Sequence, residues 1–316
     1  MRALVRFLGG VLAVACVAWI IWRFVQQGVL TKLWDDPRRD SLLLWVGIAA
    51  AVYSGCIWIM GLGWWCSLRA VHEGSLPIAP LMRVYVSSQF GKYLPGNVAQ
   101  FVGRHIMARR HGIGHAPLVA SLVIEIVSLL SAASVWGGGE LAGMAWGDAS
   151  TVRWWHVLIV VVVLGAGAAR VLQVWAKRSV GISRWLPMHS PIWLVPAAVL
   201  HLAFFTVMGL CMLAVAKHLS GASEDSLWIV PSAIAAAWAT GFVTIGAPAG
   251  IGVRELVLVA ILRGAYSEGD ALLLAASLRA VTFGGDVLSL LQALLLGRWM
   301  LNRAQRRPIL KRYVCI

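Results

Sequence analysis

The segment "GKYLPGNVAQFVGR" places polar and basic side chains inside a run that is otherwise apolar. Asn97, Gln100 and Arg104 are three and four residues apart, so a helix would carry them on one face. A helix that begins near Pro95 would also direct free backbone N–H groups and the positive end of its dipole at the preceding turn. Together with Lys92, this arrangement favours the binding of an anion such as a phosphate. The alternative is that the two basic side chains extend to the headgroups at the cytoplasmic surface.

A second segment, "GAPAGIGVREL", has the same physical features about half a chain later. Gly250 and Gly252 allow tight turns and a close approach of the backbone, and Pro248 has no backbone N–H to donate. Arg254 and Glu255 follow directly. Because adjacent residues on a helix point about 100° apart, we expect each of these two to pair with a charge elsewhere in the chain.

Three further charges lie within apolar segments: Glu125 in "SLVIEIVSLL", Arg279 in "ASLRAVTF" and Asp286 in "GGDVLSL". Charges at membrane depth are costly, so we expect these groups to pair or to face a water-filled cavity. One interpretation is a structural ion pair of Glu125 with Arg279 or Arg254, which would fix helix packing. The other is that these charges belong to a functional site.

The composition restricts the class of protein. Hydrophobic residues make up 60% of the chain and charged residues only 13%, about half the charged fraction of a soluble domain, so we expect an integral membrane protein. The formal net charge is +14, but the basic residues lie in short loops and in the C-terminal tail, which is typical of cytoplasmic loops. The five cysteines and eight histidines show no metal-ligand spacing. We therefore expect no cofactor, no metal and no nucleic-acid partner.

Six runs are long and apolar enough to cross a bilayer, which takes about 20 residues. They are Leu4–Trp22, Leu42–Cys66, Pro117–Trp136, Trp155–Leu172, Pro191–Ala216 and Ala271–Leu296. We interpret the first as an uncleaved span and not as a signal peptide, because no small-residue cleavage site follows it. Ile78–Arg104 and Trp228–Leu262 are also apolar, but Pro and Gly interrupt both of them in the middle.

The positions of Lys and Arg predict which loops face the cytoplasm. The basic segments Arg104–Arg110, Arg170–Arg184 and 299–316 are predicted to be cytoplasmic, as are both termini. The segments Gly137–Arg153, which begins with a turn at "GGG", and Lys217–Leu227 are predicted to be external. With six full spans, each interrupted segment must then form a re-entrant hairpin, the first from the cytoplasm and the second from outside. If the hairpins span the membrane instead, the chain has about eight helices.

The predicted fold is an all-α polytopic membrane protein, one membrane domain over residues 1–316 with halves at about 1–138 and 150–300. Each half has the order span, span, broken hairpin, span, and the halves have opposite orientations, with Pro95 and Pro248 at corresponding points. Such an inverted repeat with broken helices is common in secondary transporters, whose sites lie at the breaks. The alternative is that Pro and Gly merely kink two ordinary transmembrane helices.

The motifs "FGKYLPGNVAQFVGR" and "GAPAGIGVREL", followed by "LRAV", resemble the transmembrane, flippase-like domain of the lysylphosphatidylglycerol synthase family, from about residue 40 to 298. The residues that match the family motifs are Lys92, Tyr93, Pro95, Gly96, Gly103, Arg104, Pro248, Gly250, Gly252, Arg254 and Glu255. Ala249 stands where the family usually has Gly, which we expect to stiffen the turn without abolishing it. Two-part members of the family carry an aminoacyltransferase domain after the membrane part. Because this chain ends at Ile316, we expect it not to be an enzyme that aminoacylates lipid.

The resemblance implies the movement of lipids or lipid-linked molecules across the bacterial inner membrane. We expect the anionic headgroup of a phospholipid or lipid-linked substrate to bind at the two hairpins. The candidate substrate-binding residues are Lys92, Tyr93, Pro95, Gly96, Asn97, Gln100, Arg104, Glu125, Pro248, Gly250, Gly252, Arg254, Glu255 and Arg279. One alternative is a non-transporting accessory protein of a lipid or envelope glycan pathway that binds lipid and a partner, a lipid-modifying enzyme or a glycosyltransferase. Another is an intramembrane transferase that uses Glu125, Glu255 or Asp286.

Overall fold

Four long apolar helices form the frame of the molecule. They are α3 (Arg39–Val71), α6 (His115–Trp146), α8 (Leu194–Ala216), which follows a short 3-10 helix at Pro191–Trp193, and α11 (Glu268–Arg306). All four are long and apolar enough to cross a membrane, as the sequence predicted, because a continuous apolar helix satisfies its own backbone hydrogen bonds in lipid.

The structure is a computed structural model that describes residues 39–93, 98–146, 188–218, 226–244 and 248–306, together with Trp22, Val25 and Gln26. These residues contain eight α-helices and no strand. The prediction of an all-α polytopic membrane protein is therefore confirmed. The predicted spans at 4–22 and 155–172 lie, apart from Trp22, outside the described residues.

Two pairs of shorter helices are interrupted where the sequence predicted a break. In the first pair, α4 (Ile78–Ser88) leads into the 3-10 helix η1 (Gln89–Tyr93) and then α5 (Ala99–Arg109). In the second pair, α9 (Ser226–Val243) leads into η4 (Pro248–Gly250) and then α10 (Val253–Leu262). The helices of each pair pack against each other, and η1 contacts η4. Two breaks that are far apart in the sequence therefore meet inside the molecule.

The lengths of these shorter helices are informative. α4 and α5 have 11 residues each and α10 has 10, so each is about 15–17 Å long and reaches about half-way through a 30 Å hydrocarbon core. α9 has 18 residues, or about 27 Å. α5 begins at Ala99, slightly later than the start predicted near Pro95. Three of these four helices thus have the length of a half-membrane segment. The re-entrant path of each pair stays a prediction.

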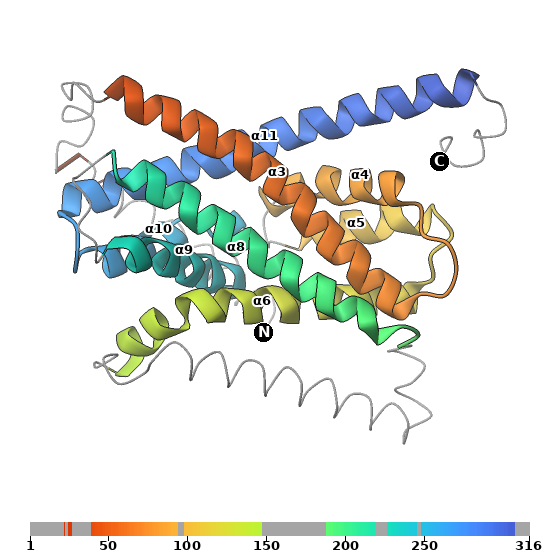
Figure 1. Cartoon of the computed structure of the whole chain (residues 1–316), viewed down its shortest axis with the longest axis horizontal. Coiled ribbons are helices and arrows are strands. Elements are labelled where there is room, and N and C mark those ends of the chain that lie inside the picture. Colours follow the sequence, from red (N-terminus) through yellow and green to blue (C-terminus); the bar gives the residue numbers. More distant parts are fainter. Residues whose placement is uncertain are drawn as a thin grey trace.

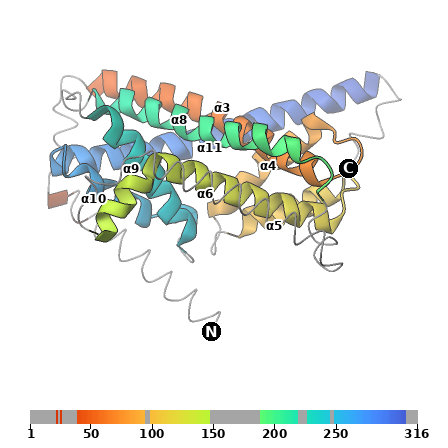
Figure 2. The same ribbon diagram turned by 60° about the horizontal axis from the view of Figure 1, so that its bottom comes forward.

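The directions of the long helices place the two broken pairs at opposite ends of the molecule (Figure 1). α3 leads to the end where α4 and α5 lie, and α6 returns from it; α8 runs beside α3 in the opposite direction, to the end where α9 and α10 lie, and α11 returns. Figure 2 shows the same separation from another side. The order long helix, broken pair, long helix thus occurs twice in the described residues, and its interpretation as an inverted repeat stays a prediction.

The two halves pack into each other through small residues. α3 packs against α8 and α11, and a Cβ at Gly285 of α11 would collide with the ring of Tyr53 in α3. α6 packs against α9, and a Cβ at Gly137 of α6 would collide with the backbone of Ala236 in α9. Glycine is common where transmembrane helices approach this closely.

The predicted external turn at "GGG" is wrong. α6 continues through Gly137–Gly139 to Trp146, so the glycines lie inside a helix and not in a loop. The physical reason is the close contact with α9 described above, which requires a residue without a side chain at Gly137. Composition alone does not distinguish a glycine that makes a turn from one that lets two helices touch.

The break between α9 and α10 has an unusual backbone. Ala249, Gly250 and Gly252 have φ angles of 51°, 68° and 87°, which lie in the left-handed region that favours glycine. For a residue with a side chain this conformation costs roughly 1–2 kcal/mol. Ala249 is the one residue of these three that carries a side chain, so the cost falls on it.

We expect Ala249→Gly to raise the free energy of unfolding by about 0.5–1 kcal/mol. The relief of the left-handed conformation, about 1–2 kcal/mol, exceeds the extra entropy that glycine loses on folding, about 0.4–1 kcal/mol. Thermal unfolding of the purified protein in detergent measures the change. Gly250→Ala is the matched control and should lower the stability, because its Cβ would lie 2.6 Å from Nε of Arg254. A lower melting temperature for Ala249→Gly would contradict the assigned backbone.

Candidate functional site

A first buried ion pair joins α5 to α6. Nη1 of Arg104 lies 2.5 Å from Oε2 of Glu125, and the two side chains are 4% and 2% exposed. The hydroxyl of Tyr85 in α4 donates to Oε1 of Glu125 at 2.9 Å, and the guanidinium of Arg104 lies 4.0 Å from the centre of the Tyr85 ring. Arg104 also donates to Oγ of Ser88 at 3.4 Å. Each charge therefore has a counter-charge and a further polar or aromatic partner, as a buried ion pair requires.

A second ion pair joins the first break to α11. Nζ of Lys92 in η1 lies 2.7 Å from Oδ2 of Asp286 and donates to Oδ1 at 2.8 Å. The hydroxyl of Tyr93 donates to Oδ2 at 2.5 Å, and Lys92 makes a longer contact of 3.4 Å with the hydroxyl of Tyr53 in α3. The carboxylate of Asp286 is fully buried. It neutralises Lys92 and holds η1 in position through two consecutive residues.

A third ion pair joins the second break to the same helix. Nε and Nη2 of Arg279 in α11 donate to Oε1 of Glu255, with Nε at 2.7 Å. The other carboxylate oxygen, Oε2, accepts the backbone N–H of Gly252 at 2.6 Å, so Glu255 also caps the N-terminus of α10. Glu255 pairs with a distant arginine and not with its neighbour Arg254, as the sequence predicted.

α11 presents the partners of both breaks on one face. Arg279 and Asp286 are two helical turns apart, and Phe283 between them makes an edge-on contact with the ring of Tyr93, with centroids 5.8 Å apart. We call Arg279, Phe283 and Asp286 the anchoring face of α11. Two chain segments without regular helix geometry are thereby fixed against a single rigid element.

Arg254 differs from the three paired cations. Its side chain crosses Gly241 of α9, where a Cβ would collide with it, and its Nε would lie 2.6 Å from a Cβ at Gly250. The guanidinium lies 5.8 Å from the centre of the Trp238 ring. Nε is buried without a hydrogen-bond partner, and no carboxylate among the described residues forms an ion pair with Arg254. The glycines make room for a cation that has no counter-charge there.

Arg254 lines two cavities, which have several lining residues in common. The first, the polar cavity, has a volume of about 40 Å³, and its polar lining comprises Gln89, Lys92, Gln100, Arg104 and Glu125 together with Tyr53 and Tyr85. The second, the apolar cavity, has a volume of about 30 Å³. Its apolar lining comprises Phe204, Phe205, Met208, Ile234, Trp238 and Leu278, and Glu255, Arg279 and Thr282 line it as well. Tyr53, Phe204, Trp238 and Arg254 line both cavities.

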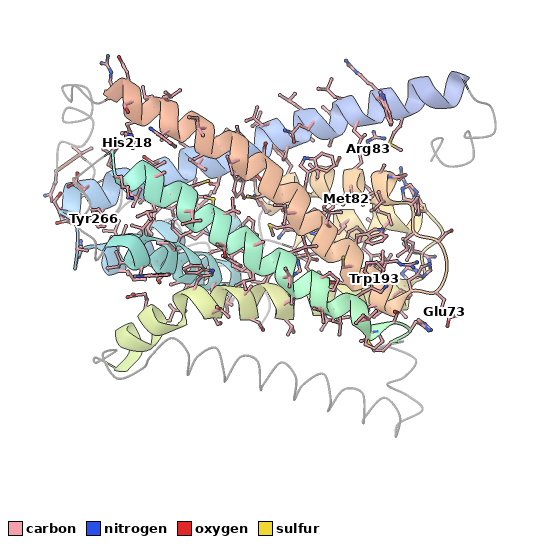
Figure 3. The ribbon with its side chains drawn as sticks, viewed as in Figure 1. Glu73, Met82, Arg83, Trp193, His218 and Tyr266 are labelled. Atoms are coloured by element: carbon pink, nitrogen blue, oxygen red, sulfur yellow. The ribbon has the colours of Figure 1, made fainter. Side chains whose placement is uncertain are left out.

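The site lies near the midpoints of three long helices. Tyr53, Phe204 and Asp286 are close to the centres of α3, α8 and α11. Figure 3 marks the two ends of the molecule, with Glu73 and Trp193 at one end and His218 and Tyr266 at the other. If these helices cross the bilayer, the site lies near the middle of the hydrocarbon core, where an unpaired cation is most costly.

The structure brings most of the predicted site residues together. Eight of them lie in or beside the two cavities: Lys92, Tyr93, Gln100, Arg104, Glu125, Arg254, Glu255 and Arg279. Pro248, Gly250 and Gly252 form the break and the start of α10 next to Arg254. Pro95, Gly96 and Asn97 lie outside the described residues.

Two expectations about individual charges are corrected. Glu125 pairs with Arg104 and not with Arg279 or Arg254. The reason is that α5, which carries Arg104, packs directly against α6, which carries Glu125. The alternative that Arg104 extends to the membrane surface is also wrong, since its side chain is 4% exposed and points to Glu125.

Several aromatic residues of the site were not identified from the sequence. Tyr53, Tyr85 and Trp238 line the polar cavity, and both tyrosines hold a charged group. A signal was present, because tyrosine is enriched at the ends of membrane spans, whereas Tyr53 lies in the middle of one. Asp286 was recognised as an intramembrane charge but was not placed among the binding residues.

The fold and the site define a class: polytopic α-helical membrane proteins whose two interrupted helix pairs meet at a buried, charged site. Within that class the chain belongs to the lysylphosphatidylglycerol synthase TM region family, whose family model matches residues 7–289. The family that the two motifs indicated is thereby confirmed. No protein in the curated set matches the chain.

We expect Arg104→Gln and Glu125→Gln each to lower the free energy of unfolding by about 3–5 kcal/mol, because each leaves a buried charge unpaired. The double variant should lose clearly less than the sum of the single variants, with a coupling energy of at least about 1 kcal/mol. Thermal or denaturant unfolding in detergent measures all three. Additive losses would show that the two side chains do not interact in the folded protein.

Proposed function

We propose that this protein translocates a lipid or lipid-linked molecule across the membrane and binds its anionic headgroup at Arg254. The observation that carries the proposal is the unpaired guanidinium on the wall of two internal cavities, between two breaks that meet. Three neighbouring cations have carboxylate partners. The Nε–H of Arg254 is buried without an acceptor, which is unfavourable, and a phosphate oxygen would supply one.

The surroundings of Arg254 suit a phosphate. Arg254 is the second residue of α10, so the positive end of the α10 dipole adds to its charge. The carboxylate of Glu255 is turned away from Arg254 toward Gly252 and Arg279. The planar guanidinium can donate two parallel hydrogen bonds to phosphate oxygens, which makes arginine more selective for this group than lysine.

The arrangement of helices supports transport. Two broken pairs approach a common site from opposite ends of the molecule (Figures 1 and 2), which is the geometry expected of inverted repeats that rock around a central site. The short arms α4, α5 and α10 are suited to re-entrant hairpins. We assign the end that carries Arg109 and Arg110 to the cytoplasm, together with both termini, because of its basic loops. The family and these loops favour the bacterial inner membrane.

The two alternatives make different demands on the same residues. An intramembrane transferase needs a carboxylate that is available as a base, whereas Glu125, Glu255 and Asp286 are each engaged in an ion pair. A non-transporting accessory protein would use the same lipid-binding site without leaflet exchange. Transport therefore has to be measured directly and separately from binding.

We expect Arg254→Gln to reduce leaflet exchange at least about tenfold, since a charge-assisted hydrogen bond contributes roughly 1.5–3 kcal/mol. The assay uses vesicles that contain the protein and phosphatidylglycerol labelled on an acyl chain, with dithionite bleaching of the outer leaflet. Because Arg254 is unpaired, the substitution should not lower the melting temperature. Arg110→Gln, at an exposed position, changes the net charge equally and is the control.

The outcomes of this assay distinguish a translocase from an accessory protein and from a transferase. Exchange by the wild type and by Arg110→Gln, with loss in Arg254→Gln, supports a translocase. Retained binding of phosphatidylglycerol without exchange in the wild type favours the accessory protein, and a chemically altered lipid favours the transferase. Equal exchange by all three proteins would show that Arg254 does not bind the headgroup.

A further inference from the structure

We propose that Phe101 and Phe242 form a side gate, a pair of rings that must separate before a headgroup can pass between the bilayer and the polar cavity. One ring comes from each broken helix pair. This inference rests on the proposed function and adds to it the two residues that control access to Arg254. Three observations carry it: the contact between the rings, their position between the cavity and the outer surface, and the residues that hold them.

The two rings meet where α5 begins and α9 ends. Phe101 is the third residue of α5, and Phe242 is the last but one of α9. Their ring centroids lie 6.3 Å apart with the planes at 84°, an edge-to-face arrangement that aromatic pairs prefer. Both helices pack against α6, and Figure 2 shows them along different parts of it. The rings thus join the first broken pair to the second.

The pair lies between the polar cavity and the outer surface of the molecule. Both rings line the polar cavity, yet neither side chain is fully buried. The neighbouring side chains of Val98, Val102 and Val243 are 57%, 50% and 62% exposed. If α5 and α9 lie within the bilayer, these valines contact lipid chains. A headgroup that enters beside them meets the two rings first.

The polar cavity is closed to a headgroup in this arrangement. Its volume of about 40 Å³ has room for a few water molecules, so part of its lining must move before a headgroup can reach Arg254. Lys92 and Arg104 are fixed by ion pairs. An aromatic pair contributes much less than a buried ion pair loses when it is broken. The contact between Phe101 and Phe242 is therefore easier to open than the charged part of the lining.

Each ring of the side gate is held by a residue of the site. Phe242 stacks on Trp238, with centroids 5.0 Å apart and planes at 9°, and the guanidinium of Arg254 lies 5.8 Å from the centre of the Trp238 ring. The Phe101 ring centre lies 5.7 Å from the guanidinium of Arg104. An anion that draws Arg254 away from Trp238 would loosen the support of Phe242. Occupancy of the site and position of the gate are thereby linked.

Access to the cavity can be measured without any transport assay. Gln100 lines the polar cavity and is 7% exposed, so Gln100→Cys should react slowly with N-ethylmaleimide in a full-length variant whose five native cysteines are replaced by alanine. Adding Phe242→Ala should speed the labelling about two- to tenfold, the factor that corresponds to the loss of an aromatic pair. Trp228→Ala is the control, because Trp228 stacks on Trp136 of α6 and lines neither cavity. Equal labelling rates with and without Phe242→Ala would overturn the inference.

A reversible cross-link tests whether the gate has to open for transport. Phe101→Cys and Phe242→Cys are combined in the same cysteine-free background and joined by a short bis-methanethiosulfonate reagent. Leaflet exchange should fall at least about tenfold, since a gate that cannot open blocks the site, and reduction should restore it. The control pair is His105→Cys with His115→Cys, whose ring nitrogens lie 2.9 Å apart and which joins α5 to α6 within the first half. That cross-link should leave exchange unchanged.

The two experiments separate the side gate from the proposed function. Full exchange by the protein cross-linked between Phe101→Cys and Phe242→Cys would contradict the gate while leaving lipid transport standing. An equal loss of exchange in the control pair would also contradict it, because the loss would then follow from restraining α5 alone. Absence of exchange in the wild type would refute the proposed function, whereas the labelling of Gln100→Cys would still decide whether the rings control access.

Discussion

Two ion pairs hold both interrupted segments against the anchoring face of α11. Lys92 of the first break pairs with Asp286, and Glu255 beside the second break pairs with Arg279. Within a bilayer, backbone without regular helix geometry is tolerated only where protein or enclosed water surrounds it. Side chains in or next to the breaks supply that support here. The hydroxyl of Tyr93 donates to the carboxylate of Asp286, and the carboxylate of Glu255 accepts the backbone N–H of Gly252. The paired charges thus stabilise the breaks before any ligand is considered.

The same pairing explains why a single cation matters. Lys92, Arg104 and Arg279 are part of the scaffold, because each is neutralised by a carboxylate of this chain. Arg254 is placed by Gly241 and Gly250 and lies near the ring of Trp238, but it has no counter-charge among the described residues. A chain that keeps such a group near the centre of its long helices retains a destabilising feature, which is typical of functional sites in membranes.

The sequence predicted those features that a short segment encodes by itself and that are energetically unfavourable within a membrane. Apolar runs of about 20 residues and the interruption of two of them by Pro and Gly predicted the long helices and the broken pairs. Isolated charges in apolar segments identified Lys92, Glu125 and Arg254 as candidates. The partners could not be predicted, because pairing depends on which helices pack together, and Glu125 was matched with the wrong arginine. Gly137–Gly139 was interpreted as a turn for the same reason, since Gly137 lets α6 approach α9.

The central claim, an anionic headgroup bound at Arg254 between the two breaks, can be observed directly. A cryo-electron microscopy map of the protein in nanodiscs that contain phosphatidylglycerol would resolve the site. We expect density for a phosphate group within hydrogen-bond distance of the guanidinium of Arg254, with the acyl chains leaving along the apolar cavity. A map in which water alone fills both cavities, or in which Arg254 has rotated to pair with a carboxylate of the chain, would contradict the claim.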